Sequence, residues 1–209
     1  MRKSELAILF LILISLAAAF ILLPRMPDQM ASHWGTEGNV DSYMSRFWGL
    51  FMMPIIAAFI LILFIIIPKI DPLKTNIKKF RKYYDSFMVL ITIFLLYIYA
   101  LTLAWNLNYT FNMNRMITPA IGLIIYYAGI LTENAKRNWF IGIRTPWTLS
   151  SPKVWDKTNK LGGKLFKIAG VIALLGILFP SYTVWLILIP VLTFTVYIIV
   201  YSYLEYQKK

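Results

Sequence analysis

The sequence predicts an all-α integral membrane protein with about six transmembrane helices. Its 209 residues are 59% hydrophobic, the mean hydropathy is +0.67, and only 14% are charged, whereas a soluble domain usually has about 25% charged residues. Apolar stretches of about 20 residues recur along the chain, a length that crosses a hydrocarbon core of about 30 Å. Because these stretches are long and continuous rather than short and alternating, they indicate helices and not the strands of a barrel.

Six apolar stretches define the expected helices. They are Leu6–Leu23, Phe47–Ile67, Phe87–Leu107, Met116–Leu131, Leu165–Phe179 and Tyr182–Tyr203. The first has no suitable cleavage site after its apolar run, so we expect it to remain as a helix rather than to act as a signal peptide. Only Pro180 and Ser181 separate the last two stretches, which predicts a tight helical hairpin.

The basic residues predict the orientation of the chain in the plasma membrane. With the N-terminus in the cytoplasm, 18 of the 21 Lys and Arg residues lie on the cytoplasmic side, as the positive-inside rule requires. Both termini, the second loop and the fourth loop are then cytoplasmic, and the first loop is outside. Contact with the anionic lipid bilayer accounts for the net charge of +12 without direct binding of nucleic acid.

The cores of the six stretches contain no Asp, Glu, Lys, Arg or His. Ion-coupled transporters and proton pumps usually have such a group near the middle of the bilayer, so this composition disfavours both, and it also disfavours catalysis within the membrane. The chain has no cysteine, which excludes disulfides, thiolate metal sites and a cysteine nucleophile. We therefore expect the functional residues in the loops, and we expect no cofactor or metal.

The long outer first loop contains the only histidine of the chain, His33, near Asp28, Glu37 and Asp41. These residues do not have the spacing of metal ligands, and binding of an external ligand or peptide is the favoured interpretation. The alternative is that His33 and the residue after it lie at headgroup level and hold the fold of the loop. The candidate binding residues here are His33, Trp34, Gly38 and Asp41.

The fourth loop, residues 132–164, carries the more informative pattern. Ser151 is expected to cap a short helix that starts at Pro152 and ends at Gly162-Gly163. The preceding segment, Arg144–Trp147, is expected to be extended or a turn, because the residue before proline avoids the α region. Three tryptophans among basic residues are also typical of an interfacial belt, but a belt does not need the ordered run from Gly142 to Leu149. The candidate binding residues are Asn138, Gly142, Arg144, Thr145, Pro146, Trp147, Thr148, Trp155, Thr158 and Asn159.

These two loops resemble a known family. The runs Asn138–Leu149 and Val154–Thr158 resemble the signature of the SdpI-like membrane immunity proteins of bacteria and archaea. The first loop is similar to the small extracytoplasmic domain often found before that signature; the residues that carry this likeness are Pro24, Pro27, His33, Trp34, Gly38, Asp41 and Tyr43. The sequence departs from the family pattern at Asn159, where a histidine is common, at Gly35, where an asparagine is common, and in Ala135–Arg137, where a proline is often found.

The resemblance implies a protein that is not an enzyme and that protects its cell from a secreted, membrane-active toxin peptide. It also implies a possible second role, signalling through a cytoplasmic repressor protein held at the membrane. The expected organisation is an N-terminal two-helix hairpin with the outer loop (1–70), a basic cytoplasmic loop with the third helix (71–115), and an SdpI-like region (116–209) that ends in a helical hairpin. Arg144→Ala is expected to impair function, through loss of a buried pair or failed folding.

Two other functions remain open from the residues alone. An exporter or facilitator of a peptide or small solute is favoured by Pro54, Pro119 and Pro190, which are expected to kink three of the helices. An interfacial membrane enzyme would use His33 with Asp41 or Glu37, although these groups have no spacing that identifies a reaction class.

Overall fold

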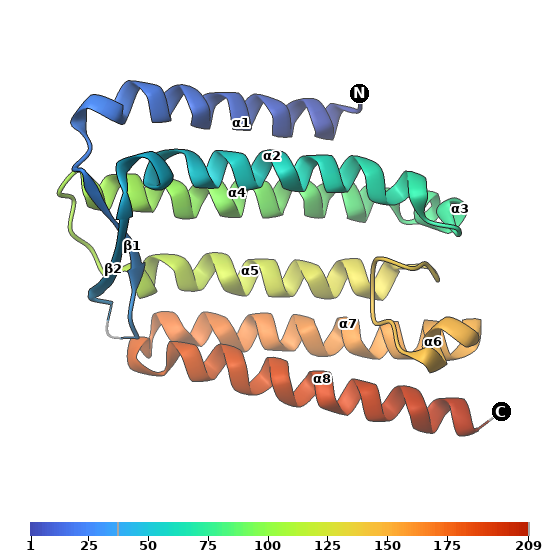
Figure 1. Cartoon of the computed structure of the whole chain (residues 1–209). Coiled ribbons are helices and arrows are strands. Elements are labelled where there is room, and N and C mark those ends of the chain that lie inside the picture. Colours follow the sequence, from blue (N-terminus) through green and yellow to red (C-terminus); the bar gives the residue numbers. More distant parts are fainter. Residues whose placement is uncertain (37, 209) are drawn as a thin grey trace. The chain divides into compact units, whose positions relative to one another are not determined.

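The computed structural model describes residues 1–36 and 38–208, and most of them are helical (Figure 1). The six expected helices are present, and the protein is a multi-pass all-α membrane protein. The long helices are α1 (Lys3–Leu22), α2 (Arg46–Ile70), α4 (Arg81–Asn106), α5 (Met113–Asn134), α7 (Pro152–Leu174) and α8 (Thr183–Gln207). Among the described residues, five helices are long and apolar enough to cross a membrane, and α7 falls short because its first half is polar and rich in lysine.

Shorter elements occupy the connections. They are α3 (Lys74–Lys79), α6 (Pro146–Ser150), the 3-10 turns η1 (Leu23–Arg25), η2 (Leu175–Ile177) and η3 (Pro180–Tyr182), and the strands β1 (Gln29–Trp34) and β2 (Val40–Ser45). The two strands form an antiparallel hairpin in which Met30 pairs with Met44 and Trp34 with Val40. The sequence analysis expected only a loop here, because the register shifts on both sides of His33 break the two-residue alternation that reveals a strand.

The helix expected to end at Gly162-Gly163 does not end there. Helix α7 begins after Ser151, whose hydroxyl accepts from the Val154 amide as predicted, and it continues to Leu174. Both glycines are required by close packing instead. A Cβ on Gly162 would lie 2.1 Å from Cδ1 of Ile143, and a Cβ on Gly163 would lie 2.6 Å from the carbonyl oxygen of Gly129 in α5.

The chain forms two compact units, Met1–Ile65 with Met88–Ile117, and Ile66–Phe87 with Thr118–Lys209. The first unit has an apolar core at one end of its helices, built from Met30 of the hairpin and from residues of α1, α2 and α4 such as Ala19, Leu50 and Tyr99. Much of the rest of α1 is exposed, including Phe10 at 63% and Leu13 at 55%, as expected for side chains that face lipid.

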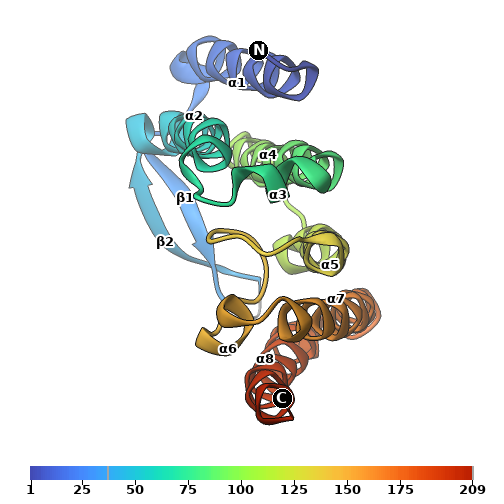
Figure 2. The ribbon, with the colours of Figure 1, turned by 90° about the vertical axis from the view of Figure 1, so that its right-hand side faces the viewer.

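In the second unit α5, α7 and α8 lie in succession, and α6 with the chain before it lies at one end of them (Figure 2). Helices α5 and α7 meet backbone to backbone at two places, Gly129 with Gly163 and Gly122 with Gly170. The two glycines of each helix are seven residues apart, or two helical turns, so both contacts lie on one face. Small residues allow this approach, which is a common way for helices to pack in lipid.

Candidate functional site

Residues 135–151, which connect α5 to α7 and include α6, are here called the signature segment. Asn138 organises its first turn and is fully buried. Its side-chain amide donates to the carbonyls of Lys136 and Ile141, both at 2.8 Å, and its oxygen accepts from the amides of Phe140 at 2.9 Å and Ile141 at 2.6 Å. All four of these hydrogen bonds fold the segment on itself.

Asn159 of α7 holds the next part of the signature segment. Its side-chain oxygen accepts from the Ile143 amide at 2.8 Å, and its amide donates to the carbonyl of Trp155 at 3.1 Å. Gly142 has a φ of +104° and a Cβ there would lie 2.6 Å from the Asn159 oxygen, so this position requires glycine. The Trp155 ring is fully buried, and its Nε1 donates to the Ala135 carbonyl at 2.8 Å.

Thr145 and Thr148 form the start of α6 and join it to α8. Thr145 is extended, as predicted for a residue before proline, but Pro146 and Trp147 begin α6 instead of continuing the extended segment or turn that was expected for Arg144–Trp147. The two threonines cap this helix reciprocally. The Thr145 hydroxyl also lies 3.1 Å from that of Ser202 in α8, and both residues are buried. Beside them the Trp147 ring lies 5.2 Å from the ring of Tyr203. The structure thus brings the candidate residues of the signature segment onto α7 and α8.

Asp71 and Asn76 hold the other side of the signature segment, and sequence reasoning missed both. Asp71 is 1% exposed, and its carboxylate accepts from the Leu73 amide at 2.6 Å and from the Trp139 amide at 2.9 Å. Asn76 in α3 donates to the Arg137 carbonyl at 2.9 Å. An acidic residue placed directly before Pro72 in a loop rich in lysine was the available signal, but nothing in the sequence indicated its partner.

Arg144 is exposed, so the expectation that it forms a buried pair was wrong. Its guanidinium donates to the Trp139 carbonyl at 2.7 Å, and Trp139 and Phe140 beside it are 52% and 37% exposed. The signature segment therefore has a buried polar interior, and its exposed residues include the Arg144 cation and two aromatic rings. In α7, the Thr158 hydroxyl is buried and has no hydrogen-bond partner among the described residues.

Ion pairs connect α7 to both of its neighbouring helices. Glu205 of α8 is 6% exposed and pairs with Lys157 of α7 and, at 3.5 Å, with Lys208. The hydrogen bond to Glu205 raises the pKa of Lys157. Further along α7, Lys167 lies 2.6 Å from the carboxylate of Glu133 in α5. Lys157 thus connects α7 to α8, and Lys167 connects α7 to α5.

In the hairpin of the first unit, His33 and Asp41 come together. His33 Nδ1 lies 2.5 Å from the Asp41 carboxylate, with side chains 68% and 51% exposed. Gly38 has a φ of +84°, which explains glycine at the turn, and Trp34 packs edge to face on Trp105 with centroids 5.7 Å apart. Glu37, the other proposed partner of His33, lies outside the described residues.

Asparagines at the ends of α4 and α5 anchor the hairpin, and the sequence analysis did not single them out. Asn106 bonds both backbone groups of Ala31, accepting from the amide at 2.8 Å and donating to the carbonyl at 3.1 Å. Asn114 donates to the carbonyls of Gly35 and Thr36. Asn106 thus satisfies the backbone groups of an edge strand, which otherwise remain unpaired.

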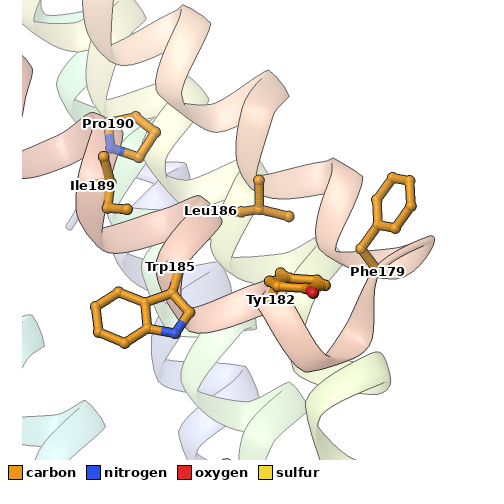
Figure 3. Close-up of a pocket in the computed structure, with 6 residues that line it drawn as sticks. All are labelled: Phe179, Tyr182, Trp185, Leu186, Ile189 and Pro190. Atoms are coloured by element: carbon orange, nitrogen blue, oxygen red, sulfur yellow. The ribbon is translucent and has the colours of Figure 1, made fainter.

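An apolar groove lies where α7 turns into α8 (Figure 3). Its volume is about 400 Å³, and in the close-up the Trp185 and Tyr182 rings lie on the same stretch of chain as Leu186. The lining residues are Phe179, Tyr182, Trp185, Leu186, Ile189 and Pro190. With no charged group in its lining, the groove suits an apolar chain or ring, such as that of a lipid or of a peptide inserted in the membrane.

These features define a class: a multi-pass α-helical membrane protein with an anchored β-hairpin after its first helix and a hydrogen-bonded polar segment before α7. No group of three or more His, Asp or Glu residues that could hold a metal ion occurs in the part of the chain that the structure describes. The exposed His33–Asp41 pair is the nearest approach to an acid–base pair, and neither residue lines the groove of Figure 3.

Comparison with known proteins identifies the family. Residues 134–203 match the model of the SdpI/YfhL protein family, and residues 10–58 match a domain of unknown function, DUF1648. The signature region is thus similar to the SdpI/YfhL family and the N-terminal region to DUF1648, which confirms the resemblance. It is 26% identical over 210 residues to "Immunity protein SdpI" of Bacillus subtilis (strain 168), an alignment that spans 100% of this chain and 98% of the relative. No solved structure matches the chain.

Proposed function

We propose that this chain is a membrane immunity protein that protects its cell against a secreted, membrane-active peptide. The observation that carries the proposal is similarity to an immunity protein along the whole chain, so that both the hairpin and the signature segment are included. An arrangement of this kind acts by binding. The polar groups inside the signature segment are used to fold it. Its exposed residues include Arg144, Trp139 and Phe140, which are residue types typical of a contact surface.

The proposal assigns different contacts to the two polar regions. By the positive-inside rule the hairpin is outside the cell, where His33, Asp41 and the 61%-exposed Tyr43 would meet the peptide. The signature segment is then cytoplasmic and would transmit the bound state or hold a repressor protein. The pair of Asp71 with the Trp139 amide supports transmission, because it ties the exposed aromatic rings directly to the chain that leaves α2.

The test is survival of a sensitive bacterial host that expresses the protein and is challenged with toxin peptides of the SDP type, while growth and membrane potential are recorded. We expect retained growth and potential with the wild-type protein. Tyr43→Ala is expected to reduce protection, and Lys160→Ala, at an exposed position on α7 without an ion pair among the described residues, serves as the control. All variants are quantified in the membrane fraction.

Three outcomes would contradict the proposal. Equal killing with and without the protein, at confirmed membrane levels, would reject immunity against these peptides. Protection that disappears when the proton gradient is collapsed, together with lower peptide accumulation before collapse, would favour an exporter. Loss of protection in His33→Ala, with peptide binding unchanged, would favour an interfacial enzyme.

A further inference from the structure

A second groove, between α5 and α7, differs in chemistry from the groove of Figure 3. Its volume is about 470 Å³. It is lined by Tyr126 of α5 and by Lys164, Lys167, Ile168, Val171 and Ile172 of α7. The groove therefore has apolar walls along most of its length and two lysines at one end, since Lys164 and Lys167 precede the apolar residues along α7.

The two lysines are not equivalent. Lys167 is paired with Glu133 at 2.6 Å, and its charge is largely compensated. Lys164 is exposed and makes no ion pair within the described part of the chain. It is therefore a cation without a counter-ion beside an apolar groove, and the nearest compensated cation lies one turn further along the same helix.

The position of the lysines along α7 fixes the depth of this charge. The twelve residues from Ile168 to Phe179 carry no charge, and Ile168 and Val171 are 49% and 53% exposed. Lys164 and Lys167 thus stand where the apolar part of α7 begins, which is the level of lipid headgroups. A ligand that satisfies both parts of the groove must carry an anion next to an apolar chain.

We propose that this groove binds one anionic phospholipid. Its phosphate would lie at Lys164, with Lys167 shared between the phosphate and Glu133, and one acyl chain would lie along Ile168, Val171 and Ile172. Basic pockets between helices at headgroup level are known to bind anionic headgroups. A soluble phosphate would leave the apolar walls uncovered, and a zwitterionic lipid would bring a second cation next to Lys164.

The experiment is native mass spectrometry of the full chain from detergent micelles that contain equal amounts of phosphatidylglycerol and phosphatidylcholine with identical acyl chains. We expect one phosphatidylglycerol to be retained in preference to phosphatidylcholine. Lys164→Gln should reduce this preference about fivefold, the effect of one basic residue at a lipid surface. Lys160→Gln removes an equal charge from the same helix outside the groove and should leave the preference unchanged.

A second variant tests the acyl groove without changing charge. Val171→Trp fills it at an exposed position, and it should reduce retention of both lipids while the thermal midpoint in detergent stays that of the wild type. Equal retention of the two lipids by the wild type, or an equal effect of Lys164→Gln and Lys160→Gln, would overturn the proposal. Displacement of phosphatidylglycerol by free glycerol phosphate would overturn it in favour of a simple phosphate site.

Discussion

Asn159 is a buried amide at a position where the family resemblance implies a histidine, and its side chain bonds the backbone of the signature segment. The Ile143 amide donates to it at 2.8 Å, and the side chain is 1% exposed. Hydrogen bonding thus persists at this position without a titratable group. The Asn159 side chain therefore cannot accept or release a proton in a function of this chain.

Asn159→Ala is expected to lower the free energy of unfolding by about 1–3 kcal/mol, because it leaves the buried Ile143 amide without an acceptor. The measurement is thermal or denaturant unfolding in detergent, followed by tryptophan fluorescence. Lys160→Ala, the adjacent exposed residue, is the control. An equal loss in both variants would show that the Asn159 hydrogen bonds contribute nothing specific.

Substitution of Arg144 can distinguish an effect on function from an effect on folding. The residue is exposed and its hydrogen bond is made to one backbone carbonyl, so Arg144→Ala should change the free energy of unfolding by less than about 1 kcal/mol. If the exposed surface of the signature segment binds a partner, the same variant should lose protection. Growth under peptide challenge and unfolding in detergent are measured in parallel. Full protection would exclude Arg144 from the contact surface.

At the scale of elements, the crossing of α5 and α7 is set by glycines rather than by large apolar side chains. Gly129 with Gly163 and Gly122 with Gly170 bring the two backbones into contact. The Lys167–Glu133 pair closes the same interface at its polar end. This crossing also positions the start of α7, which carries Trp155 and Asn159 into the signature segment.

Gly163→Val should destabilise the protein by about 1–3 kcal/mol or more, because its side chain would overlap the Gly129 carbonyl and the helices cannot separate freely. Ile168→Val places the same residue on the exposed face of the same helix and should have little effect. The readout is the thermal midpoint in detergent together with the fraction of monodisperse protein. A tolerated Gly163→Val would mean that the two helices do not cross at these glycines.

At the scale of the whole molecule, the chain has no cysteine, so its topology can be mapped with single introduced thiols. Ser42→Cys in the hairpin and Ser150→Cys in α6 are both at exposed positions. We expect a membrane-impermeant maleimide to label Ser42→Cys in intact cells and Ser150→Cys only after permeabilisation. Labelling of both in intact cells would contradict the orientation predicted from the basic residues.

The long helices were predictable because lipid imposes a simple requirement. A backbone that crosses the bilayer must satisfy its own hydrogen bonds over about 20 apolar residues. Each segment meets this requirement with its own residues, independently of the other segments. The Ser151 cap and the extended Thr145 were predictable for the same reason, since both depend on adjacent residues alone. The family resemblance likewise followed from uncommon residues within single runs of sequence.

Contacts between distant residues were decided by the tertiary structure. The Asp71 carboxylate reaches an amide 68 residues away, and Asn106 bonds Ala31 across 75 residues, and no local pattern specifies either partner. Gly162 and Gly163 have the same local appearance as a helix end, yet packing against Ile143 and Gly129 makes them interior positions of α7. Sequence alone determined which long segments are helices and which loops carry the polar residues. Only packing decided which polar groups form hydrogen bonds inside the fold and which, such as Arg144 and Lys164, remain exposed.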